Sequence, residues 1–415
     1  MSDHRQVVAP YLVSCLFFLT AWLLSPLLAD DFQGSSHLLD FELDPIRYSK
    51  AASRTMVDVL GASVKEGRQV IRHSETGGYL KALLESLDIS TTSQVLVFSK
   101  SSAQRDHINP RNPRAIYFND DVYVGYIPGA PSLELTASDP RLGTVFYTLD
   151  QKRANKPEFK RTSQCLECHA ASRTMGVPGH LFRSFSVDSS GWVDFTELGD
   201  QMNHRLPFVD RYGGWYLSGK EVSDVTHGRR LLNLDAVGAG SVPFHAGDYP
   251  ESGSDIVALM VLGHQVHFHN YLTRLNYEAR IAMWQYGHVR YLKQQIEGFL
   301  RYILFVDEAP LPDVTTGHRG FVDDFLKRSK KDDQGRSLRD FDLTSRLFRY
   351  RCSYLIGSAA FNALEATVRR EISLRLKAIL ESSDPKAPFA VLPKSERESI
   401  RSILVSTEQS ITSFW

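Results

Sequence analysis

The chain has 415 residues, of which 42% are hydrophobic and 23% are charged. Lysine and arginine together number 48, and aspartate and glutamate also number 48, so the formal net charge is zero. This balance argues against a nucleic-acid or polyanion binder, because such proteins carry a basic surplus. The length and hydrophobic content suffice to build one or more cores.

The N-terminal segment, residues 1–29, is dominated by an apolar run over residues 7–29. This run predicts an export signal, with cleavage expected after Ala29. It is also long enough to cross a bilayer, so an uncleaved anchor is the alternative. The predicted location is therefore periplasmic or secreted, or membrane-anchored and facing the periplasm. This segment is the sole expected membrane contact.

The next region, residues 30–150, combines two predicted helices with short β-rich runs. The helices are expected over residues 48–71 and from residue 78 onward. Strands are expected at residues 94–98, 115–118, 122–127, 133–137 and 144–149. Their connections are too short for parallel crossovers, which predicts an antiparallel sheet.

The remaining chain divides into an irregular segment, residues 151–253, and a helical region, residues 254–415. The irregular segment is rich in Gly, Pro, Asp and Ser. Ser254 and Asp255 begin a buried helix that is expected to reach about residue 291. Further helices are predicted at residues 342–355, 358–381 and 395–408, with a solvated loop over residues 327–339. The expected fold class is α+β.

The irregular segment contains the sequence Cys165-Leu166-Glu167-Cys168-His169. Cys-x-x-Cys-His is the pattern of covalent c-type haem attachment, in which two thiols bond the porphyrin vinyl groups and the histidine ligates the iron. The motif occurs once, so one haem c is predicted. Half of a zinc site and a thiol redox pair are the alternatives.

The second axial position of the iron separates electron transfer from ligand chemistry. Candidates are Met202 and His204, which lie together in the irregular segment, with Met175, His180 and His227 as weaker ones. An iron without a second protein ligand is the remaining alternative.

Two further groups of residues could serve a haem. Arg211 could hold a propionate and Trp215 could flank the ring, although a packed turn explains the same residues equally well. His264 and His267 are spaced to share one face of the buried helix. They could line a haem pocket, supply a distal ligand, bind a second metal, or simply pack in the core.

Several segments resemble a group of uncharacterised, secreted bacterial proteins with a single c-type haem. The resemblance rests on the haem motif and on residues 94–100, 113–125, 213–216 and 254–261. It implies export, one haem and a distal ligand at His204. The group often carries a Glu where this chain has Gly263, which argues against an acid/base role at that position.

The sequence thus predicts an exported monohaem c-type cytochrome that transfers single electrons to or from a redox partner protein. The alternative is a peroxidase-like haem oxidoreductase with an open or displaceable distal site, with Arg211, His264 or His267 in its pocket.

Overall fold

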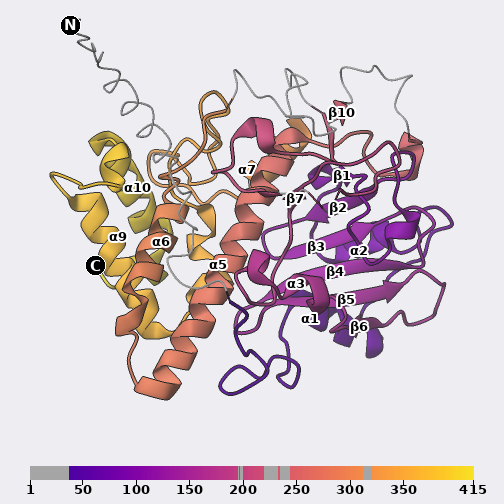
Figure 1. Cartoon of the computed structure of the whole chain (residues 1–415), viewed down its shortest axis with the longest axis horizontal. Helices are drawn as coiled ribbons and strands as arrows, with labels where there is room; N and C mark the ends of the chain where they lie inside the picture. Colours follow the sequence, from indigo (N-terminus) through magenta and orange to yellow (C-terminus); the bar gives the residue numbers. More distant parts are fainter. Residues whose placement is uncertain (1–36, 195, 197–199, 219–231, 234–243, 312–318) are drawn as a thin grey trace, which may run out of the picture.

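The computed structural model describes residues 37–194, 196, 200–218, 232–233, 244–311 and 319–415. The predicted signal or anchor lies outside these residues, as does His227. Within them the fold is α+β, as predicted. A sheet with short helices forms one half and a helical region forms the other, with α5 (Ile256–Tyr286) between them (Figure 1).

The sheet is a six-stranded antiparallel meander in which every strand pairs with its neighbour in sequence. Its strands are β1 (Val95–Val97), β2 (Arg114–Phe118), β3 (Val122–Tyr126), β4 (Ser132–Asp139), β5 (Gly143–Asp150) and β6 (Phe159–Arg161). The predicted strands are confirmed, because alternation and short turns favour local pairing.

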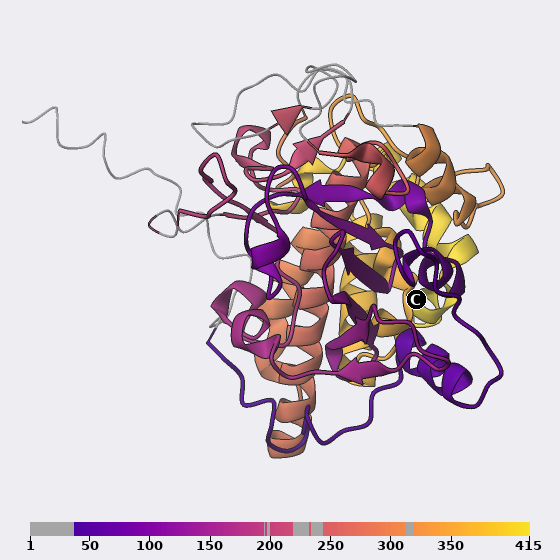
Figure 2. The ribbon, with the colours of Figure 1, turned by 90° about the vertical axis from the view of Figure 1, so that its right-hand side faces the viewer.

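One face of the sheet packs on α1 (Met56–Lys65) and α2 (Leu80–Ser86) and forms a buried sheet core. The first predicted helix is shorter than expected, because Thr55 and Asp58 form a capping box that begins it only at Met56. The opposite face meets α5 and the irregular segment; in Figure 2 the strands lie in front of α5.

Helix α5 is buried continuously from Ile256 to Tyr277. The Asp255 carboxylate accepts a 2.7 Å hydrogen bond from the Ala258 amide at its start, and Gly287 ends it in the left-handed region at φ 69°. The helix therefore stops before the predicted residue 291.

A helical core surrounds the other side of α5. It contains α6 (Lys293–Ile303), α7 (Arg319–Lys327), α8 (Ala359–Asn362), α9 (Ala366–Glu381), α10 (Lys394–Thr407) and α11 (Gln409–Thr412). No helix in the described ranges is long and apolar enough to cross a membrane.

Three predictions for this region are wrong. No helix forms over residues 342–353, because the Asp342 carboxylate binds the amides of Thr344 and Ser345 in a local turn that competes with a helix. The helix expected over residues 358–381 is two helices, because extended backbone at Glu365 separates α8 from α9.

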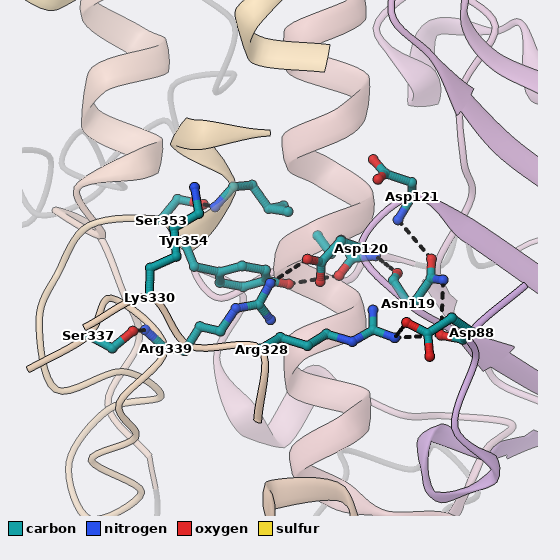
Figure 3. A network of polar contacts seen from close by, with 12 residues as sticks. Asp88, Asn119, Asp120, Asp121, Arg328, Lys330, Ser337, Arg339, Ser353 and Tyr354 are labelled. Atoms are coloured by element: carbon teal, nitrogen blue, oxygen red, sulfur yellow. Dashed lines mark hydrogen bonds and ion pairs between the residues drawn. The ribbon is translucent and has the colours of Figure 1, made fainter. Parts of the chain in front are cut away.

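The loop at residues 327–339 is not wholly solvated, since Arg339 is buried and ion-paired with Asp120 on the β2–β3 turn (Figure 3).

The segment at residues 151–253 is irregular where it is described, as expected. It contains the one-turn helix α3 (Leu166–His169) and the two-residue strands β7 (Arg183–Ser184), β8 (Asp200–Gln201), β9 (Tyr216–Leu217) and β10 (Leu232–Asn233).

Candidate haem-attachment site

The Cys-x-x-Cys-His motif folds as a single helical turn. The His169 amide donates a 2.8 Å hydrogen bond to the Cys165 carbonyl, which closes the turn. Neither Cys165 nor Cys168 forms a disulfide; the first is half-buried and the second is exposed. A spacing of three residues places both thiols on one side of a helical turn. Both are therefore available to bond one porphyrin.

His169 is held by the backbone in the orientation that an iron ligand requires. Its Nδ1 lies 2.9 Å from the Gly179 carbonyl oxygen, and the Gly179 amide donates back to the His169 carbonyl at 2.8 Å. A carbonyl can only accept, so Nδ1 carries the proton and Nε2 presents its lone pair. Burial also lowers the pKa of His169, which favours the neutral, ligating form.

The sheet supplies an apolar neighbour to His169. The Phe146 ring meets the imidazole edge-to-face at 5.1 Å between centroids. Burial raises the pKa of the Cys165 thiol to about 11, with a further rise from Glu134 that Arg114 partly offsets. The Cys165 thiol therefore stays protonated at neutral pH.

Helix α5 fixes the loop that carries Gly179. The Asn270 carboxamide accepts from the His180 amide at 2.7 Å and donates to the His180 carbonyl at 2.8 Å. Arg274 donates to the Met175 carbonyl at 2.9 Å and forms an ion pair with Glu278 at 2.7 Å. These contacts hold the loop, and the loop in turn holds His169.

The residues present therefore fit a covalently attached haem c. Cys165 and Cys168 would form the thioether bonds, and His169 would supply the proximal nitrogen to the iron. Gly179, Asn270 and Phe146 complete the site, and no local pattern predicts them, since their roles arise from contacts across the fold.

His204 lies in a different environment from the motif. Its Nδ1 is 3.2 Å from the His264 Nδ1, and its ring packs at 4.5 Å on Tyr302 and 4.3 Å on Phe305. His264 and Asn270 are six residues apart on α5 and so occupy different faces of that helix. The structure thus places His204 on the face toward α6, whereas the loop that carries Gly179 binds at Asn270.

Met202 and Met175 pack in the helical core, whereas His180 directly follows Gly179 in the loop that holds His169. The Met202 sulfur accepts a 3.0 Å hydrogen bond from the Tyr212 amide, and Met175 is buried in the helical core. The His180 ring packs at 4.4 Å on Tyr123, and its Nε2 is buried without a hydrogen-bond partner among the described residues.

Arg211 and Trp215 make the contacts of a packed turn. The Arg211 guanidinium donates to the carbonyls of Leu206 at 2.7 Å and His204 at 2.9 Å. The Trp215 indole donates to the Arg183 carbonyl at 2.9 Å and packs on Phe182 at 4.7 Å. Both side chains stabilise the irregular segment, and neither contacts the Cys-x-x-Cys-His turn in these interactions.

His264 and His267 do share one face of α5, as the spacing predicts, and both rings meet Tyr302 of α6. The His264 Nε2 is 2.8 Å from the Ser353 hydroxyl. In the part of the chain that the structure describes, no three His, Cys, Asp or Glu side chains are grouped so as to hold a metal ion. These histidines are packed core residues in this arrangement.

Comparison with known proteins finds no match to this chain among family models, curated proteins or solved structures. Any functional assignment therefore depends on the geometry of the site.

Proposed function

We propose that this protein is an exported monohaem c-type cytochrome that transfers single electrons. The observation that carries the proposal is the folded motif: two free thiols on one helical turn, followed by a histidine whose Nδ1 is bound to the Gly179 carbonyl. This orientation of His169 supports a metal ligand over a thiol redox pair, which needs no histidine ligand. The Cys-x-x-Cys-His spacing favours haem over zinc.

When bound, the haem supplies a centre that accepts one electron from a donor protein and passes that electron to an acceptor protein. The chain's own residues have three tasks. Cys165 and Cys168 anchor the porphyrin, His169 ligates the iron, and Phe146 limits the access of water to the proximal side. Thioether attachment takes place outside the cytoplasm, in agreement with the apolar N-terminal segment.

The location of the distal candidates favours a second function. His204 is bound to His264, and the Met202 sulfur accepts from Tyr212, so neither faces His169. An iron without a sixth protein ligand would bind small molecules and could catalyse peroxidase-like oxidation of a donor.

The test is to export the full chain from a host with cytochrome c maturation machinery and to record ferric, ferrous and ferrous carbon monoxide spectra. The proposal expects haem that survives denaturation, that is lost in the Cys165→Ser/Cys168→Ser variant, and that is retained in Cys352→Ser. A wild-type protein without covalent haem would overturn it. A ferrous spectrum unchanged by carbon monoxide supports electron transfer, whereas a shifted spectrum supports the oxidoreductase.

A further inference from the structure

An ion pair lies beside the haem motif on the same face of the sheet. Glu134 on β4 pairs across the sheet with Gly125 on β3, and Gly125 pairs with Ile116 on β2. Arg114 lies two residues before Ile116 on β2 and so shares that face. Its Nη2 is 2.6 Å from the Glu134 carboxylate. The next strand contributes Phe146, which packs on His169.

The pair is fixed in position by the sheet. A Cβ at Gly125 would lie 2.5 Å from the Arg114 Nη2 and 2.7 Å from its Nε, so the guanidinium lies directly against the glycine backbone. The Ser102 hydroxyl donates to the Glu134 carboxylate at 3.0 Å. The Arg114 Nε is buried and has no hydrogen-bond partner among the described residues.

Both charges act on the residues of the motif. After burial, which raises the pKa of the Cys165 thiol, Glu134 raises that pKa and Arg114 lowers it. The two charges act in the same senses on the pKa of His169, after burial and the Gly179 hydrogen bond. The two side chains retain only 23% and 19% of their solvent exposure, so water screens them incompletely.

We infer that Arg114 and Glu134 shift the reduction potential of the haem carried by Cys165, Cys168 and His169 in opposite directions, so that the intact pair keeps the two contributions in balance. The inference rests on the proposed function. Ferric haem carries one more positive charge than ferrous haem, so the Glu134 carboxylate favours the ferric form and the Arg114 guanidinium favours the ferrous form. The pair is close to neutral as a unit, and loss of either member leaves the other charge uncompensated.

The test is a spectroelectrochemical titration of the full-length holoprotein with Arg114→Gln, Glu134→Gln and the double variant. Arg114→Gln is expected to lower the midpoint potential and Glu134→Gln to raise it, while the double variant stays near the wild type. The control is Arg351→Gln/Glu396→Gln, which removes an ion pair of the same 2.6 Å length, with side-chain exposures of 14% and 9%, in the helical region. Its potential should be unchanged.

Opposite shifts distinguish an electrostatic role from a structural one, because loosening of the site would move both single variants in the same direction. Shifts of equal sign, or no shift, in holoprotein with a normal spectrum would overturn the inference and leave the proposed function intact. Absence of covalent haem in the wild type would overturn both. If Arg114→Gln fails to fold, Glu134→Gln must still raise the potential.

Discussion

At the scale of single residues, the Gly179 carbonyl and the buried Asn270 carboxamide determine the orientation of the histidine in the Cys-x-x-Cys-His motif. His169 is oriented by the Gly179 carbonyl, and the adjoining residue, His180, is held on both its backbone groups by Asn270. The Asn270 side chain pairs with the His180 backbone as a neighbouring strand would, because its carboxamide has one acceptor and one donor in the same plane. The orientation of His169 thus depends on Asn270, which is far away in sequence.

Replacing Asn270 by Ala should destabilise the protein by about 3 kcal/mol. The variant leaves the amide and carbonyl of His180 buried without partners, at about 1–3 kcal/mol for each group. Urea unfolding at neutral pH measures the effect. Asn276→Ala is the matched control, because Asn276 is also buried on α5 but its Oδ1 has no hydrogen-bond partner in the described ranges. Its cost is expected to stay below about 1 kcal/mol, and equal losses in the two variants would refute this role of Asn270.

His264 should make the protein less stable in acid. Burial lowers its pKa to about 3, with smaller effects from His267 and His269. The unfolded chain titrates near 6.5, so between about pH 6.5 and 3 the unfolded state binds the extra proton and stability falls as pH falls. From pH 7 to 4.5 this one group contributes a loss of about 2–3 kcal/mol.

The variant His264→Phe keeps the ring packing on Phe305 and Tyr302 and removes the titrating group. Its loss of stability between pH 7 and 4.5, measured by urea unfolding, should be smaller than that of the wild type by about 2–3 kcal/mol. His245→Phe serves as the control, because that side chain is 79% exposed. An unchanged pH dependence in His264→Phe would show that the folded protein protonates His264 as readily as the unfolded chain does, which would contradict the lowered pKa.

At the scale of secondary structure elements, α5 positions the site because it is buried on all sides. One of its faces meets the irregular segment closely: a Cβ at Gly263 would lie 3.2 Å from the Phe182 ring and 3.6 Å from the Met202 carbonyl. A glutamate at this position would need a different neighbour from Phe182. In this chain the glycine permits the close approach.

Gly263→Glu should therefore cost about 3 kcal/mol or more, since it places an unpaired carboxylate in the helical core. Gly263→Ala should change stability by less than about 1 kcal/mol, because a gain in helix propensity offsets a small displacement of Phe182. Thermal or urea unfolding of both variants tests the packing. A well-tolerated Glu would mean that Phe182 does not lie against α5.

The elements that the sequence predicted correctly are those specified by local patterns. Alternating residues and the Asn119–Asp121 turn determine the β2–β3 hairpin, and the apolar run after Asp255 determines the start of α5. Asp342 and Glu365 broke predicted helices because their carboxylates bind nearby backbone amides. The motif was also evident in sequence, whereas the positions of His204, Arg211 and Trp215 depend on which face of α5 each segment meets, and no local pattern encodes that.

At the scale of the whole molecule, the two cores meet across α5 and are joined by polar contacts. Arg339 lies between the rings of Tyr354, at 4.3 Å, and Phe325, at 4.6 Å, and forms an ion pair with Asp120 on the sheet (Figure 3). Tyr354 donates to Gln265 at 2.7 Å, and Gln265 donates to the Asn119 carbonyl at 2.6 Å. The sheet is thereby fixed to the helical region.

Arg339→Met should lower the free energy of unfolding by about 2–3 kcal/mol, because it leaves the half-buried Asp120 carboxylate without its partner. The control is Arg328→Met, which removes the neighbouring pair with Asp88. That pair is exposed, with side-chain exposures of 33% and 88%, and its loss should cost less than about 1 kcal/mol.

Urea unfolding followed by far-ultraviolet circular dichroism measures both variants. Raising the salt concentration should reduce the small Arg328 effect and leave most of the Arg339 effect, since water and ions screen a buried pair poorly. Equal effects of the two substitutions would show that the buried pair does not couple the sheet to the helical region.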